Sequence, residues 1–255
     1  MVIEKSESVM ARLAEIAQKG FSPSALTSYI RNPIQFYFQK IIKIREVEEV
    51  EENIAVNTLG TIIHETLLEL YKPFVGKVLK VEDVKGLFVK IEPEVLNQFK
   101  EIYKEGDIQK GRNLLVFEVA KRNIFNFLNV ELKGLEEGDE VIILSLEERF
   151  ERNFEHPELP FPVLIGGSVD RIEERNGRIR IIDYKTGKVE SASVTLKKWN
   201  DLTTEIKNDK IIQILAYAFM FEKHANGKEM EVGIFSFKNL RNGFLPFKFK
   251  EGKEA

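Results

Sequence analysis

The stretch GGSVDRIEERNGRIRIIDYKTGK, residues 166–188, predicts two β-strands that are joined by a tight turn. Asn176 and Gly177 separate two runs of β-forming residues, and an Asn-Gly pair in this position is typical of a two-residue hairpin turn. A turn of this length determines the register of the hairpin, so that Asp170 on the first strand lies opposite Asp183 on the second. The sequence therefore predicts two carboxylates side by side on one face of a sheet.

Two facing carboxylates need a positive charge near them, because directly opposed side chains on a hairpin have Cβ atoms about 4.5–5.5 Å apart. Lys185 follows Asp183 by two residues and therefore projects from the same face of the strand. Apolar residues flank both aspartates, so burial of the two charges without a partner would be costly. A structural ion-pair cluster of Asp170, Asp183 and Lys185 is one interpretation, but the facing acids favour a site for a hard divalent cation, Mg²⁺ or Mn²⁺.

The composition excludes several other kinds of site. The 255 residues include no Cys, which rules out disulfides, thiolate metal sites, iron–sulfur clusters and cysteine nucleophiles, and the presence of only three His argues against a histidine-rich zinc site. A net charge of −3 does not indicate a nucleic-acid partner, which would have to meet a local cluster of cations. No apolar run approaches the roughly 20 residues of a membrane span, and the first residues do not resemble a signal peptide. We therefore expect a cytoplasmic protein without a membrane partner.

The order of helical and extended patterns predicts one α/β domain over residues 1–255, with a mixed central sheet flanked by helices. Residues 1–20 have the pattern of an amphipathic helix, residues 21–140 are mainly helical and residues 141–255 form the sheet core. A first helix is expected to start at Ser22 and to break at Asn32-Pro33. Further helices are expected over residues 58–71 and 211–224. The pattern between them, over residues 81–132, is helical with interruptions at Pro93, Gly106 and Gly111. The expected strands outside the hairpin cover residues 141–151, 231–240 and 244–250.

The hairpin resembles the active-site hairpin of the RecB-like branch of the PD-(D/E)XK nuclease superfamily. This branch carries Gly-x-x-Asp on one strand, Asp-Tyr-Lys-Thr-Gly on the next and Gln-x-x-x-Tyr on a following helix, which correspond here to residues 167–170, 183–187 and 213–217. LGTIIH at residues 59–64 resembles the helix that supplies a histidine ligand, and residues 21–38 resemble the N-terminal element of AddB-type nuclease domains. The resemblance implies a restriction-endonuclease-like fold with a helical N-terminal half.

The resemblance also implies roles for individual residues. Lys185 would position the attacking water and offset charge on the phosphate. Gln213 and Tyr217, four residues apart on one helix face, would orient phosphate or DNA, although a polar helix edge and a buried phenol are the structural alternative. The implied metal ligands are His64, Asp170, Asp183 and the backbone carbonyl of Tyr184, and the implied catalytic residues are Asp170, Asp183, Lys185, Gln213 and Tyr217.

The histidine and the neighbouring acids leave alternatives open. His64 can be an ordinary helix residue, since metal ligation needs partners at the right spacing. Glu65 is a rival ligand, although its side chain points about 100° away around the helix. Glu147 and Glu148 lie on the strand before the hairpin, where either can support the site or simply be solvated, so neither belongs to the core assignment.

One departure from the family pattern concerns a cluster. Several members of this branch place a Cys before the Pro of the N-terminal element, as one of four ligands of an iron–sulfur cluster. Asn32 occupies that position here and the chain has no Cys, so no such cluster is expected. Its structural role would fall to packing by Tyr29, Phe36, Tyr37 and Phe38. A second departure, Val169 in place of the Pro in the superfamily's name, is unremarkable within this branch.

Nucleic-acid binding requires local cations. The candidates are Lys40, Lys43, Arg45, Lys188, Lys197 and Lys198. Trp199 follows two of these lysines and can either stack on a base of single-stranded DNA or serve as an anchor in the core.

The resemblance implies a metal-dependent DNA nuclease, most simply an exonuclease that acts from ends or on single strands. Relatives often form the nuclease part of helicase–nuclease systems in DNA repair or recombination. The chain has no Walker-type Gly-x-x-x-x-Gly-Lys element, so a helicase would be another domain or subunit. The alternative is a catalytically inactive DNA-binding or scaffolding module with the same fold, and a weaker one is a hydrolase of another phosphodiester.

Overall fold

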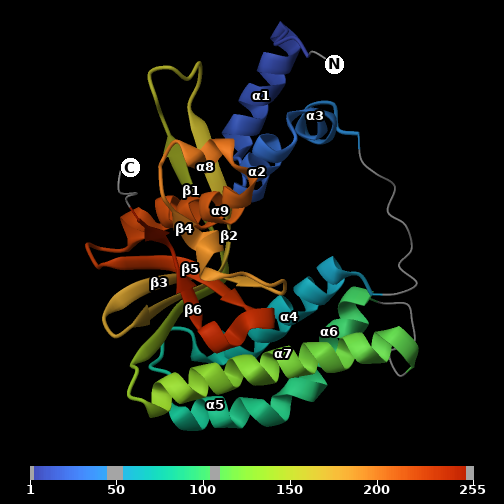
Figure 1. Cartoon of the computed structure of the whole chain (residues 1–255), viewed down its shortest axis with the longest axis vertical. Coiled ribbons are helices and arrows are strands. Elements are labelled where there is room, and N and C mark those ends of the chain that lie inside the picture. Colours follow the sequence, from blue (N-terminus) through green and yellow to red (C-terminus); the bar gives the residue numbers. More distant parts are fainter. Residues whose placement is uncertain (1–2, 45–53, 104–109, 251–255) are drawn as a thin grey trace.

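A five-stranded mixed sheet forms the centre of the computed structural model, which describes residues 3–44, 54–103 and 110–250. The strand order is β1-β2-β3-β5-β6, in which β3 and β5 are parallel and the other neighbours are antiparallel. Helices cover both faces of this sheet (Figure 1), which confirms the expected α/β class with a mixed sheet flanked by helices. The strands are β1 Val141–Phe154, β2 Val163–Arg175, β3 Arg178–Lys185, β5 Met230–Ser236 and β6 Phe244–Pro246.

The β2–β3 hairpin has the predicted register. The ladder ends at the pair of Arg171 and Ile182, and the same register continued by one residue would pair Asp170 with Asp183. Asn176 and Gly177 have φ angles of 53° and 80°, and two consecutive left-handed residues are the reason that this tight turn favours Asn-Gly. Asn176 Oδ1 also accepts a hydrogen bond from the backbone N–H of Glu140 at 2.9 Å, which ties the turn to the start of β1. The ladder includes the pairs Arg175 with Arg178, Ile172 with Ile181 and Arg171 with Ile182.

One helical layer, below the sheet in Figure 1, covers the face that carries Tyr184. It consists of α4 Val56–Tyr71, α5 Val81–Leu87, α6 Ile91–Tyr103 and α7 Gly111–Glu136. The Phe127 ring of α7 contacts the rings of Tyr184 and Phe235 at centroid distances of 5.4 and 5.2 Å. Ile62, Ile63 and Leu67 of α4 are fully or almost fully buried in the same core. This layer therefore orients α4, the helix that carries His64.

The opposite face of the sheet is covered by α9 Asp209–Phe221, with α1 Glu7–Lys19, α2 Pro23–Arg31 and α3 Pro33–Phe36 beyond it (Figure 1). Ile214 and Met220 of α9 are buried in a second core with Ile172 and Ile181 of the hairpin. The predicted helix start is confirmed, because Ser22 caps α2 and its Oγ accepts a hydrogen bond from the backbone N–H of Ala25 at 3.1 Å.

The start of α2 is attached directly to β2. Phe21 forms a parallel bridge with Ile165, in which its N–H donates to the carbonyl of Leu164 at 2.8 Å. Gly167 permits the close approach that follows, because a Cβ at this position would lie 3.0 Å from Cδ of Pro23. The glycine of the Gly-x-x-Asp motif therefore has a packing reason: it lets α2 begin against the strand that carries Asp170.

The N-terminal aromatic residues pack in part as expected. The Phe36 ring is buried and contacts the rings of Phe21 at 6.4 Å and Tyr29 at 5.4 Å, while Tyr37 contacts Phe38 at 5.9 Å. Tyr29 itself remains largely exposed. After α3 the chain continues in a π-helical turn, η1 Tyr37–Ile41.

Three expectations about element boundaries were wrong. The strand expected over 231–240 ends at Ser236, because the Ser236 hydroxyl bonds Val189 and Gly187 of the loop after β3, and the chain turns into the 3-10 helix η7 Phe237–Asn242. The strand expected over 244–250 is divided into β6 and β7 Lys248–Phe249, and β7 pairs with β4 Thr195–Leu196 in a separate two-stranded sheet. Pro93 does not interrupt a helix, because it lies in the first turn of α6, where its missing N–H has no intrahelical acceptor.

The remaining elements are short. They are α8 Asp201–Thr204 and the 3-10 segments η2 Lys72–Phe74, η3 Phe88–Lys90, η4 Ser191–Val194, η5 Ile206–Asn208 and η6 Glu222–His224. In the described part of the chain, no helix has both the length and the apolar character that crossing a bilayer demands.

A buried ion network fixes the hairpin to α7. Arg171, which is fully buried, donates to Glu131 of α7 at 2.6 Å, and its guanidinium lies 4.8 Å from the centre of the Tyr71 ring. Arg175 donates to the same Glu131 and, at 2.8 Å, to the buried Glu173. Burial alone would raise the pKa of Glu131, but the two guanidinium groups outweigh it and lower the pKa to about 2. The network therefore holds β2 in place immediately beside Asp170.

Candidate active site

Acidic residues on three neighbouring strands lie in one row across the sheet. The β1–β2 ladder pairs residues on either side of Glu147 and Asp170, namely Leu146 with Arg171 and Glu148 with Val169, and so places Glu147 opposite Asp170. The register of the hairpin places Asp183 on the other side of Asp170. The predicted pair of aspartates is thus extended by a third carboxylate, from the strand that precedes the hairpin.

The backbone is irregular at this row. Glu147 has a φ of 46°, which is uncommon for a residue other than glycine and departs from the extended backbone of a strand. Val169 and Ile172 both pack in the core beneath α9, although strict alternation would place residues three apart on opposite faces. The alternation of β2 therefore changes phase near Asp170. As a consequence the Asp170 carboxylate reaches across to β3, where it accepts a hydrogen bond from the backbone N–H of Tyr184 at 2.5 Å.

His64 meets two of these acids from α4. Its Nδ1 lies 3.5 Å from a carboxylate oxygen of Glu147 and 3.6 Å from one of Asp170, and the three side chains offer ligand atoms within 4.8 Å of one another. Burial lowers the pKa of His64, but the hydrogen bond to Glu147 and the charges of Asp170, Glu147 and Asp183 raise it to about 8. The rival Glu65 lines the same cleft but does not belong to this cluster.

The Asp170 carboxylate is in an electrostatically unfavourable position. The pKa of Asp170 is raised to about 7. Burial is the largest cause, the neighbouring charges of Asp183 and Glu147 raise the pKa further, and His64 lowers it. A divalent cation bound between these oxygens would remove the repulsion between the carboxylates. Such a cation prefers carboxylate oxygens as ligands and also accepts an imidazole nitrogen. The donor set and the open cleft beside it therefore fit a hard divalent cation.

Asp183 forms an ion pair with Lys185, the lysine for which the sequence predicted a catalytic role. Lys185 Nζ lies 2.9 and 2.7 Å from the two carboxylate oxygens of Asp183. Asp183 is almost completely buried, and burial is the first cause that raises its pKa, while Lys185 counteracts it. Asp183 is consequently not a member of the three-residue cluster, which contains Glu147 in its place. The Lys185 ammonium borders the cleft, where it can face a bound anion.

The polar pair on α9 lies beside the same carboxylates. Gln213 Nε2 donates to the hydroxyl of Tyr217 at 2.9 Å. Burial raises the pKa of the Tyr217 phenol, and the charges of Asp183 and Asp170 raise it further, so the phenol is neutral and close to both acids. Because Gln213 donates to the Tyr217 hydroxyl, this geometry fits both a structural role of the pair and a role in orienting phosphate or DNA.

An open cleft of about 450 Å³ adjoins the cluster. One wall is the N-terminal half of α4, from Val56 to Glu65, and the other is the end of β3 with Thr186 and Gly187. His64, Glu147 and Lys185 all line it, so a ligand in the cleft would meet one carboxylate of the cluster, the imidazole and the ammonium together.

Two cations beside the site were not identified from the sequence. Arg31 at the end of α2 forms an ion pair with Asp209, and Lys210 Nζ lies 3.5 Å from the same carboxylate, so two positive charges share one acid. Burial lowers the pKa of Lys210, and the positive charges of Arg31 and Lys185 lower it further. A signal was available in the sequence: Lys210 precedes Gln213 by three residues and Tyr217 by seven, a spacing that shares one helix face.

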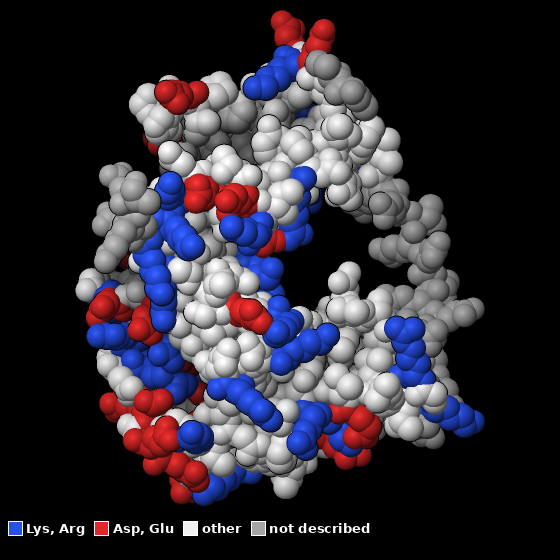
Figure 2. Space-filling model, in the orientation of Figure 1, with Lys and Arg blue, Asp and Glu red and all other residues white. Residues whose placement is uncertain are grey.

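Cationic side chains are also concentrated along a hollow in the surface. Figure 2 shows Lys and Arg side chains along the wall of the hollow between the α1–α3 part and the α4–α6 part. Of the cations proposed from the sequence, Lys40 and Lys43 are exposed, Lys188 is paired with Glu190 at 2.5 Å, and Arg45 lies outside the described residues. Trp199 is 54% exposed, which excludes the alternative of a core anchor, and stacking on a base stays a prediction.

Comparison with known proteins gives a family match over most of the chain. Residues 20–252 match the PD-(D/E)XK nuclease superfamily. An uncharacterized protein of Rickettsia felis is 23% identical over 177 residues, which are 66% of this chain and 19% of that protein. An uncharacterized protein of Rickettsia bellii is 23% identical over 199 residues, which are 73% of this chain and 22% of that protein. The chain thus spans about a fifth of the length of these relatives.

Proposed function

We propose that this chain, which belongs to the PD-(D/E)XK nuclease superfamily, is a metal-dependent nuclease that hydrolyses phosphodiester bonds in DNA. The observation that carries the proposal is the convergence of His64, Glu147 and Asp170 on one point, with the Asp183–Lys185 pair beside them. The order of motifs alone would also suit a degenerate relative. A set of acids, imidazole and ammonium around one open cleft is what hydrolysis requires.

In this proposal the cation, Mg²⁺ or Mn²⁺, is held by His64, Glu147 and Asp170, with Asp183 and the backbone carbonyl of Tyr184 as further ligands. Carboxylate oxygens with one imidazole suit a hard divalent ion, and a cation bound here would counteract the burial and the charges of Asp183 and Glu147 that raise the pKa of Asp170. When bound, such an ion lowers the pKa of a water molecule and offsets negative charge on the scissile phosphate.

The side chains around the cation site have separate roles in this proposal. Lys185 Nζ orients the attacking water and faces the negative charge that grows on the phosphate, since it lies at the cleft wall and is held by Asp183. Gln213 and Tyr217 donate hydrogen bonds that orient the phosphate group. Arg31 and Lys210 extend the positive charge along the path of the strand, where they hold a phosphate next to the scissile one.

The cellular setting is a finer part of the proposal. We infer an exonuclease that acts on DNA ends or single strands in the cytoplasm, as the nuclease part of a helicase–nuclease system for repair or recombination. Both relatives extend far beyond the matched region, which accords with a nuclease unit inside longer polypeptides. The rival is an inactive DNA-binding or scaffolding module. It is disfavoured because Asp170, Asp183, Lys185, Gln213 and Tyr217 are all present and adjacent.

The test is a cleavage assay on linear and circular, single- and double-stranded DNA, and on RNA, with Mg²⁺ or Mn²⁺. We expect the wild-type chain to degrade linear DNA, and Asp183→Ala and Lys185→Ala to abolish cleavage. Lys133→Ala is the matched control, because this exposed lysine of α7 is paired with Glu137 and does not line the cleft. Intact nucleic acid under every condition would refute the catalytic proposal and favour the binding module, and cleavage of circular substrates would refute the exonuclease assignment.

A further inference from the structure

An aromatic pair is exposed on the surface outside the cleft. The indole of Trp199 stacks on the Phe249 ring at a centroid distance of 5.1 Å and an interplanar angle of 16°, and Phe247 lies 6.3 Å away. Trp199 is 54% exposed and Phe249 39% exposed. More than half of the Trp199 surface is therefore open to solvent although the indole stacks on Phe249. The two stacked rings thus form one exposed apolar surface.

The backbone beneath these rings holds them in place. β4 and β7 form a parallel pair in which Leu196 lies opposite Phe249, and the N–H of Lys250 donates to the Leu196 carbonyl at 2.9 Å. The Leu196 side chain is buried at 1% exposure and so anchors the strand that leads to Trp199. The stacked pair is therefore preorganised, and a flat ligand that joined the stack would not have to order it first.

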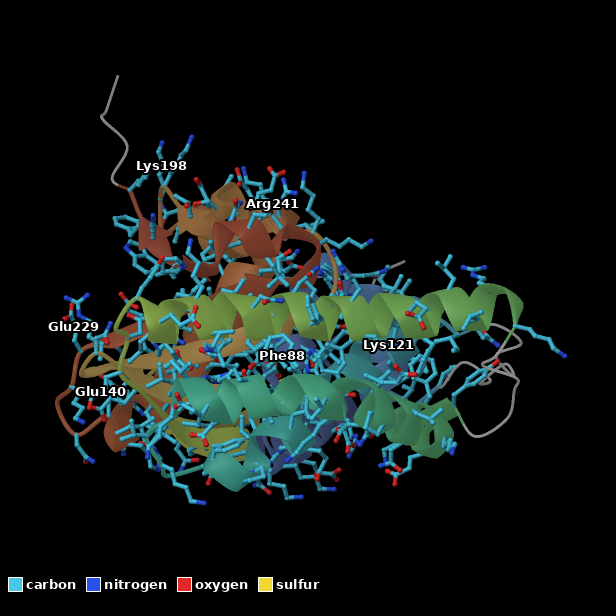
Figure 3. The ribbon with its side chains drawn as sticks, turned by 90° about the horizontal axis from the view of Figure 1, so that it is seen from below. Phe88, Lys121, Glu140, Lys198, Glu229 and Arg241 are labelled. Carbon is cyan, nitrogen blue, oxygen red and sulfur yellow. The ribbon has the colours of Figure 1, made fainter. Side chains whose placement is uncertain are left out.

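Lysines adjoin both aromatic residues in the sequence. The lysines at positions 197, 198, 248 and 250 are all exposed, and within the described residues none of them forms an ion pair. Two other lysines of the same region do have acidic partners, Lys188 with Glu190 and Lys207 with Glu205. Figure 3 shows Lys198 at the edge of the molecule, where its side chain is accessible. The surface around Trp199 is thus complementary to a flexible polyanion that carries flat groups.

We propose that Trp199, Phe249 and the four lysines form a binding site for single-stranded nucleic acid, separate from the metal cluster. An unpaired base stacks on the exposed Trp199–Phe249 pair, and the lysines meet the phosphates on either side. A duplex does not fit this site, because its bases are already stacked on one another. The site goes beyond the proposed nuclease activity, since it uses no metal ligand and no residue of the cleft.

Trp199 is the only tryptophan of the chain, so its fluorescence reports on this site alone. The experiment is a titration of the wild-type chain in EDTA, which prevents metal-dependent cleavage, with a 12-nucleotide oligothymidylate. A duplex, an abasic strand of equal length, oligouridylate and polyglutamate are titrated in parallel. We expect saturable quenching by oligothymidylate and much weaker quenching by the duplex, the abasic strand and polyglutamate. Quenching by oligouridylate as well would assign the site to single strands of both sugars, and its absence would assign it to DNA.

Variants separate stacking from charge when binding is measured by anisotropy of a labelled oligonucleotide. We expect Trp199→Ala to weaken binding by roughly 5- to 150-fold and Trp199→Phe to restore most of the affinity, because a phenyl ring still stacks. Lys198→Gln should reduce the slope of log affinity against log salt by about 0.7. Lys90→Gln, which removes an equally exposed lysine from η3, should change neither quantity.

Several outcomes would overturn the inference. Binding without any change in tryptophan fluorescence would locate the nucleic acid elsewhere, and equal quenching by the abasic strand would remove the stacking role. Equal quenching by polyglutamate would make the site a surface for an acidic protein. A lack of binding would overturn it as well. None of these results bears on cleavage, and a chain that binds in EDTA but never cleaves with metal would refute only the proposed nuclease.

Discussion

Replacement of Glu131 by Gln tests the ion network that holds the hairpin against α7. Gln preserves the size of the side chain but removes the charge that Arg171 and Arg175 share. It also replaces one of the two oxygens that accept from Arg171, Arg175 and the Tyr71 hydroxyl with an amide donor. Removal of one partner of a buried ion pair typically costs 3–5 kcal/mol, because a charge is left without compensation. We therefore expect the free energy of unfolding to fall by about 3–5 kcal/mol in urea denaturation at neutral pH.

The pKa of Glu131 gives a second estimate of the same quantity. The carboxyl pKa is 4.5 in the unfolded chain and about 2 in the folded one, and each unit corresponds to about 1.4 kcal/mol, so the charged form contributes about 3 kcal/mol. Because the folded pKa is depressed, this contribution is complete above pH 4.5 and is lost as the pH falls toward 2. The stability difference between wild type and Glu131→Gln should therefore fall to less than half between pH 7 and pH 3.

A matched control is available on the same helix. Glu136→Gln removes an exposed carboxylate that pairs with Lys85 at 3.2 Å, and it should change the unfolding free energy by less than about 0.5 kcal/mol. A loss below 1 kcal/mol for Glu131→Gln at pH 7 would refute the reasoning. A difference of the same size at pH 7 and pH 3 would also refute it, because it would show that the charge on Glu131 is not what stabilises the fold.

Three further predictions concern the site and the turn. Glu147→Gln should weaken Mn²⁺ binding in calorimetry by at least roughly tenfold while Glu148→Gln leaves it unchanged, and equal effects would contradict the assignment of Glu147 as a ligand. Lys210→Gln should raise KM for an oligonucleotide and weaken the salt dependence of KM, while kcat stays nearly unchanged. A loss confined to kcat would argue against a phosphate contact of Lys210. Gly177→Ala should lower the unfolding free energy by about 1 kcal/mol. The cost comes from the backbone alone, because φ is 80° at this position and the added Cβ would contact no other atom. Unchanged stability would exclude the left-handed turn.

The parts of the site that depend on local backbone rules were predictable. Asn176-Gly177 specifies a turn by its φ preferences, and the two-residue period of a strand then carries Asp170 to a position opposite Asp183 and Lys185 to the same face. Gln213 and Tyr217 share a helix face for an equally local reason. The ends of elements were harder, since β5 ends at Ser236 through hydrogen bonds to a loop that lies 47 and 49 residues earlier in the chain.

The sequence by itself thus determined the hairpin register, the mixed sheet flanked by helices and the order of the acidic, basic and amide groups. Only the tertiary structure decided that Glu147 joins His64 and Asp170, because this required a change of phase in β2 and a left-handed residue in β1 at the same row. It also decided that Arg31 and Lys210 share Asp209 and that Trp199 faces solvent. These outcomes depend on how helices distant in sequence pack on the sheet, and such packing obeys no local period.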